Sequence, residues 1–94
     1  MNVIIPVILT VLVIVVGGFA VYLADYKQPG ANITKVGNAL WWSVGTVSTV
    51  GYGDYTPITA VARIIATIVM FSGIGIALTL VTIIGQTRIQ RMQE

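Results

Sequence analysis

Cysteine and histidine are both absent from the 94 residues of this sequence. The chain therefore cannot form disulfides, and it lacks the usual ligands of a zinc site. Charged residues are scarce as well, at 9% against about 25% in typical soluble domains. The three acidic residues, Asp25, Asp54 and Glu94, lie far apart in the sequence, so nothing supports an enzyme. A net charge of +2 without a basic cluster argues against nucleic acid as a partner.

Apolar residues, in contrast, make up 56% of the chain, and its mean hydropathy is +0.94. Such a composition indicates a membrane protein whose solvent is lipid. A chain of this length forms one small domain, and two helices cannot bury a large core by themselves. We therefore expect it to bury surface against membrane lipid and against copies of itself.

The first uncharged run, residues 2–24, is long enough to span a bilayer and predicts an outer transmembrane helix. Pro6 is tolerated near its start. Gly17 and Gly18 in its second half indicate close contact with another helix. A signal peptide is the alternative, but the run is too long and no positive segment precedes it.

Residues 25–37 are expected to form a polar loop, the extracellular loop if both termini are cytoplasmic, with a turn signal at Pro29-Gly30. The tripeptide Asn32-Ile33-Thr34 matches the N-glycosylation pattern, a short and common motif. The next uncharged stretch is too short to span a membrane, so a re-entrant helix is expected over residues 38–48, with Asn38 as its N-cap. The irregular segment 49–54 that follows is the candidate filter, and such backbone survives at membrane depth only when it is buried or lines a water-filled cavity.

A second long apolar run predicts an inner transmembrane helix over residues 59–89. Charge alone does not orient the chain. Two cations, Arg88 and Arg91, mark the side of the termini, whereas three mark the other side, namely Lys27, Lys35 and Arg63.

The candidate filter suits a cation that must exchange its water shell for backbone carbonyls. An ordinary strand alternates its carbonyls, so an unusual conformation is needed, and Gly51 and Gly53 reach positive φ without a Cβ penalty. Val50 and Tyr52 can then send their side chains outward into packing, and the Thr49 hydroxyl can add a further ring of oxygens. One chain offers only part of a coordination shell, which implies a symmetric tetramer.

Thr49-Val50-Gly51-Tyr52-Gly53 is the potassium-channel signature, and residues 39–44 (ALWWSV) are similar to prokaryotic potassium channels. The resemblance covers nearly the whole chain. It implies a single pore domain over residues 1–94, an all-α membrane protein with two transmembrane helices and a re-entrant pore helix. It further implies a homotetramer, in which three identical subunits join each chain, passing K⁺ across the cell membrane with both termini cytoplasmic.

The resemblance also implies roles for individual residues. The implied potassium-binding residues are Thr49, Val50, Gly51, Tyr52 and Gly53, and the first four supply the ion ligands. Trp41, Trp42 and Tyr52 form an aromatic cuff, although plain interfacial anchoring of the two Trp residues is the alternative. Asp54 lies at the outer mouth and bonds to Trp41, the alternative being a solvated loop Asp. Gly45 stands where some bacterial two-helix channels have Glu, which puts carboxylate-dependent inactivation in doubt and suggests a small void or a water behind the filter.

On the inner helix, Gly73 occupies the place of a hinge glycine, with close helix packing as the alternative. Ile74, Ala77, Val81 and Gly85 share a face with it that lines the cavity and the inner constriction, where apolar rings can gate by dewetting. Residues 70–80 look more like prokaryotic voltage-gated pores than a complete two-helix channel. This favours a pore module whose voltage-sensor domain, a further partner, is absent from the chain. A non-conducting subunit and a non-selective channel remain alternatives, disfavoured by the intact segment 49–54 and by Tyr52.

Overall fold

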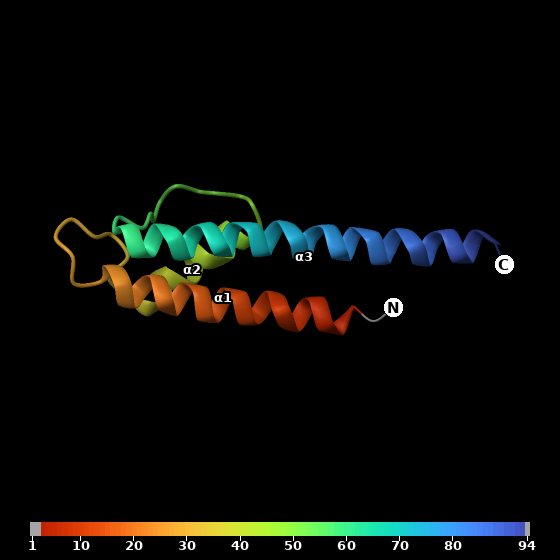
Figure 1. Cartoon of the computed structure of the whole chain (residues 1–94), viewed down its shortest axis with the longest axis horizontal. Coiled ribbons are helices and arrows are strands. Elements are labelled where there is room, and N and C mark those ends of the chain that lie inside the picture. Colours follow the sequence, from red (N-terminus) through yellow and green to blue (C-terminus); the bar gives the residue numbers. More distant parts are fainter. Residues whose placement is uncertain (1–2, 94) are drawn as a thin grey trace.

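The structure, a computed structural model, describes residues 3–93, which fold into three helices and no strand. These are α1 (Ile4–Asp25), α2 (Val36–Val47) and α3 (Ala60–Gln93). Figure 1 shows α1 and α3 side by side and antiparallel, so that both termini lie at the same end. The short helix α2 packs against both long helices in the half of the molecule away from the termini (Figure 1).

Helices α1 and α3 are long and apolar enough to cross a membrane. In their most apolar stretches only 22% and 17% of residues are buried, so neither resembles the core helix of a soluble protein. With 22 and 34 residues they measure about 33 and 51 Å, against about 30 Å for the hydrocarbon core. Helix α2 has 12 residues and cannot span. The architecture is therefore an all-α membrane protein with two spans and one short helix between them.

The helix ends differ by a few residues from those expected from the sequence. Helix α2 begins at Val36, with Lys35 at its N-cap in an extended conformation, so the expectation that Asn38 caps it was wrong. The Ala39 N–H already donates to the Lys35 carbonyl at 3.0 Å, which places Asn38 inside the first turn. Helix α3 continues to Gln93 because Arg, Gln and Met favour helix. The first residue of the expected outer helix, Asn2, lies outside the described residues.

Two adjacent glycines let α1 approach both of its neighbours. A Cβ placed on Gly17 would lie 2.5 Å from the Val69 Cγ2 atom of α3. One placed on Gly18 would lie 3.1 Å from the Ala39 carbonyl oxygen of α2. The expected close helix contact at these glycines is confirmed, and it fixes α2 between the two spans.

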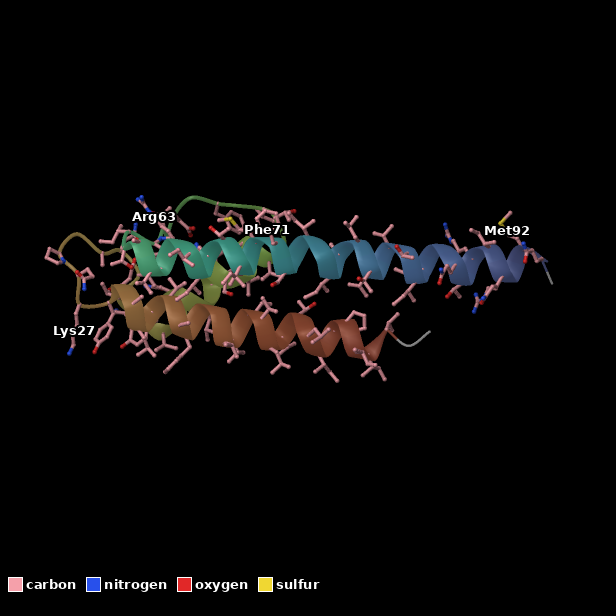
Figure 2. The ribbon with its side chains drawn as sticks, in the orientation of Figure 1. Lys27, Arg63, Phe71 and Met92 are labelled. Carbon is pink, nitrogen blue, oxygen red and sulfur yellow. The ribbon has the colours of Figure 1, made fainter. Side chains whose placement is uncertain are left out.

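A small core joins the three helices near the end opposite the termini. Its buried members are Val21, Ile33, Ala39, Trp42, Ala62 and Ala66. Beyond this core most large apolar side chains are exposed, including Phe71 at 70% (labelled in Figure 2). One chain therefore leaves its long helices to be covered by lipid or by other copies.

Candidate functional site

The candidate filter starts at the C-terminal end of α2 and is bonded to that end. The Thr49 N–H donates to the Thr46 carbonyl at 3.1 Å, and the Gly51 N–H donates to the Gly45 carbonyl at 3.1 Å. A helix C-terminus carries partial negative charge. The segment is thereby anchored where that charge favours a cation.

The backbone of the candidate filter takes left-handed dihedral angles at alternate residues. The φ angle is 64° at Thr49, 62° at Gly51 and 77° at Gly53. The two glycines behave as expected from the sequence. Thr49 was not foreseen, because a β-branched residue rarely adopts positive φ and such strain costs about 1–3 kcal/mol. Strain of this kind persists only where the surrounding structure imposes it.

Trp41 on α2 supports the outer half of the segment in two ways. Its Nε1–H donates a hydrogen bond to Asp54 Oδ2 at 2.9 Å. Its ring stacks on the Tyr52 ring with centroids 5.3 Å apart and an interplanar angle of 14°. The structure thus brings together Trp41, Tyr52 and Asp54, including the bond that the resemblance implied for Asp54.

Gly45 faces the same cluster from the next turn of α2. A Cβ at this position would lie 3.2 Å from the Tyr52 Cδ2 atom. The Tyr52 ring therefore packs against Gly45, and a water behind the filter stays a prediction. A cleft of about 200 Å³ remains beside the ring, and Gly45, Tyr52 and Pro57 are among the residues that line it.

Trp42 lines the same cleft as Trp41, Tyr52 and Asp54, but it makes a different set of contacts. Its side chain is buried in the core with Val21 and Ala62, and among residues 3–93 no ring stacking joins it to Tyr52 of the same chain. Val50 extends from the segment and is 55% exposed. Within one chain, Trp41 is the member of the expected cuff that stacks on Tyr52, and the part of Trp42 in the cuff stays a prediction.

The residues expected to line an inner cavity occupy different surroundings. Ile74 lines a cleft of about 300 Å³ below the candidate filter, together with Thr46, Thr49, Gly51 and Met70. Ala77 lies next to the end of α2 in a cleft of about 210 Å³. Val81 is exposed and Gly85 half-buried, on the stretch of α3 beyond the core. Ile74 thus shares a cleft with Thr49 and Gly51 of the candidate filter.

Gly73 is a packing residue in this structure. Helix α3 runs through it without interruption, and a Cβ there would lie 2.6 Å from the Val47 carbonyl oxygen. The structure therefore shows the close-packing alternative at Gly73, with the end of α2 resting on α3.

Two functional candidates were not identified from the sequence as such. Asp25, at the end of α1, is fully buried and accepts hydrogen bonds from Ile58 and Thr59. Asn32 accepts one from the Thr56 N–H at 3.0 Å. Both bond to the segment that leaves the candidate filter. The sequence showed Asp25 as a charged residue next to an apolar run, but its hydrogen-bond partners could not be predicted.

Known proteins resemble this chain over most of its length. A family model described as ion channel matches residues 8–90. A voltage-gated potassium channel of Aeropyrum pernix is 46% identical over 69 residues, covering 73% of this chain and 23% of the relative. A calcium-gated potassium channel of Thermoplasma volcanium is 34% identical over 85 residues, covering 86% of this chain and 24% of the relative. The chain thus spans less than a quarter of the length of either relative.

A solved structure has the same fold. It is the crystal structure of a voltage-gated K⁺ channel pore module in a closed state in lipid membranes, with a TM-score of 0.76 and 30% sequence identity. The match covers 95% of this chain and 93% of the other. The likeness therefore extends over both long helices, α2 and the candidate filter.

Proposed function

This chain belongs to the ion channel family that its residues 8–90 match, and from that premise we propose that four identical copies form a potassium-selective pore. Membership of a family of ion channels, rather than of enzymes, leaves passive ion conduction as the activity. The potassium channels among its relatives and the K⁺ channel pore module with the same fold support the choice of ion.

The observation that carries the proposal is the alternation of left-handed residues at Thr49, Gly51 and Gly53. Alternating the hand of successive residues turns peptide carbonyls toward one side, whereas a regular strand points them to opposite sides. A row of carbonyls on one side can replace the hydration shell of an ion. In the proposed pore, the carbonyls of residues 49–52 and the Thr49 hydroxyl bind K⁺, and Gly53 completes the turn of the backbone.

Neighbouring residues complete the proposed pore. The negative end of α2 stabilises a cation below the filter, and four copies of Asp54 concentrate cations at the outer mouth. Trp41 holds Asp54 and Tyr52 in place, and Trp42 supports them from the core, where it lines the same cleft. In this proposal the pore domain consists, in chain order, of an outer helix (α1), an extracellular loop, a pore helix (α2), the filter and an inner helix (α3).

The inner half of α3 is proposed to hold the gate. Ile74, Ala77, Val81 and Gly85 line the cavity and its inner constriction, and a bend at Gly73 would break its contact with Val47.

Lys27 and Arg63 lie at the filter end and Met92 at the opposite end (Figure 2). We propose that the filter end faces the extracellular side of the cell membrane and that both termini lie in the cytoplasm. The relative with 46% identity is voltage-gated, so we propose that this pore works with a voltage-sensing domain.

The test is the reversal potential of the purified protein in a planar bilayer with K⁺ on one side and Na⁺ on the other. We expect reversal near the potassium equilibrium potential. Gly53→Ala should abolish this selectivity, because alanine is strained at the φ of 77°.

Gly30→Ala is the matched control, since Gly30 also has positive φ, at 83°, but lies in the loop after α1 with nothing within 4 Å of an added Cβ. It should keep selectivity. Clear current that reverses near zero in the wild-type protein would contradict the proposed function.

A further inference from the structure

The segment that leaves the candidate filter, residues 54–59, is hydrogen-bonded to three different parts of the chain. Asp54 bonds to Trp41 on α2. The Thr56 N–H bonds to Asn32 in the loop between α1 and α2. Ile58 and Thr59 bond to Asp25 at the end of α1. Two of these three attachments come from residues that precede the pore helix.

Asp25 forms the deeper attachment. Its carboxylate is fully buried, and both oxygens accept hydrogen bonds. The Ile58 N–H donates to Oδ2 at 2.8 Å, and the Thr59 N–H and hydroxyl donate to Oδ1 at 3.2 and 2.7 Å. The same Thr59 hydroxyl accepts from the Ala62 N–H at 3.1 Å, which caps α3. Asp25 thereby joins the end of α1 to the start of α3.

Asn32 forms the outer attachment, and its loop is itself held in place. The neighbouring Ile33 is fully buried in the core that contains Trp42. Because Ile33 fixes the backbone, the Asn32 side chain is presented to Thr56 rather than left free to turn toward solvent. Its amide oxygen accepts the Thr56 N–H at 3.0 Å.

We infer that Asn32 and Asp25 form a brace that, in addition to Trp41, positions the exit of the filter. This inference rests on the proposed function, and it makes both residues positioning residues for ion selection. The filter holds three left-handed residues, one of them a threonine, and such a backbone persists only where its surroundings determine it. Helix α2 fixes the entrance through Gly45 and Thr46, and the brace fixes the other end.

The brace also gives a role to the tripeptide Asn32-Ile33-Thr34 that differs from glycosylation. The two roles make different demands on the chain. Glycosylation needs both Asn32 and Thr34 and a free Asn32 amide. The brace needs only an acceptor oxygen at residue 32, and Thr34 is exposed and takes no part in it.

Three variants of the full chain in nanodiscs distinguish the two roles of Asn32, namely the brace and glycosylation. Asn32→Ala removes the acceptor, Asn32→Asp keeps an oxygen in its place, and Thr34→Ala removes the tripeptide pattern while leaving the brace intact. The first readout is hydrogen exchange of the Thr56 amide. Loss of one such hydrogen bond should speed its exchange roughly fivefold in Asn32→Ala, with Asn32→Asp and Thr34→Ala close to wild type.

The second readout is the permeability of Na⁺ relative to K⁺ for the same four proteins. We expect roughly a fivefold rise in Asn32→Ala and none in the other two variants, since the filter exit loses one hydrogen bond only there. Equal behaviour of Asn32→Ala and Thr34→Ala would overturn the inference. Faster exchange with unchanged permeability would overturn it as well, because the bond would then be structural only. A wild-type protein without potassium selectivity would instead reject the proposed function on which the inference stands.

Discussion

Gly73 lies where α3 crosses the end of α2, and its missing side chain allows that crossing. An added Cβ would meet the Val47 carbonyl oxygen at 2.6 Å and the Val47 Cα at 3.0 Å, both backbone atoms that cannot turn aside. Overpacking of this kind costs about 1–3 kcal/mol. We therefore expect Gly73→Ala to lower the thermal stability of the purified assembly, measured by circular dichroism in detergent.

Gly75 provides the matched control two residues along the same helix. Nothing lies within 4 Å of a Cβ added there, and alanine favours helix over glycine by about 1 kcal/mol. Gly75→Ala should thus leave stability unchanged or raise it. Equal destabilisation by both substitutions would show that backbone flexibility, rather than the contact with Val47, makes glycine necessary at Gly73.

How far single residues were predictable depends on whether their conformation is a local property. Positive φ at Gly51 and Gly53 follows from the residue type and could be predicted. Positive φ at Thr49 could not, because the local preference of threonine opposes it, and it occurs where the Thr49 N–H donates to the Thr46 carbonyl. The choice between hinge and packing at Gly73 depended on where Val47 lies, which is a tertiary fact.

Between whole helices, the contact of α1 with α3 depends on one close approach. A Cβ on Gly17 would lie 2.5 Å from Val69 Cγ2, a side-chain atom that a second substitution can remove. We expect Gly17→Ala to destabilise the protein, and Val69→Ala in the same chain to restore part of that loss. The measurement is a double-mutant cycle on thermal stability, where coupling between contacting residues is typically about 0.5–3 kcal/mol.

Additive effects of the two substitutions would contradict this packing. Gly85→Ala combined with Val69→Ala is the control pair, because a Cβ on Gly85 has no atom within 4 Å and lies on the far part of α3. That pair should be additive.

The helices themselves were predictable from uncharged runs, whereas the bonds between helix ends were not. Apolar length identified both spans, and the short stretch between them identified α2. From the sequence, Asp25 was interpreted as a polar residue at the end of the first apolar run. It is fully buried, however, and accepts hydrogen bonds from residues that lie 33 and 34 positions later in the chain. Only the antiparallel packing of α1 on α3 brings these positions together, and no local pattern encodes it.

For the assembled pore, stability and ion binding should be linked. One chain exposes Val50 and Tyr52 of the candidate filter and most of its apolar helix surface, so in the proposed tetramer the filter is complete only when copies surround it. An ion that binds the assembled state alone stabilises it, by about 2.7 kcal/mol at a concentration one hundred times its dissociation constant. Replacing K⁺ with Na⁺ should therefore lower the temperature at which the wild-type assembly dissociates, measured by gel mobility after heating.

Gly53→Ala decides whether this difference comes from the filter. If the ion acts through the backbone of residues 49–53, the variant should dissociate at the same temperature in both salts, whereas Gly30→Ala should keep the difference. A potassium effect that survives in Gly53→Ala would assign the stabilisation to general salt effects on the exposed charges, such as Asp54 and Arg63. A wild-type assembly indifferent to the ion would mean that the left-handed filter backbone is held by Trp41, Gly45 and the end of α2 without any contribution from bound potassium.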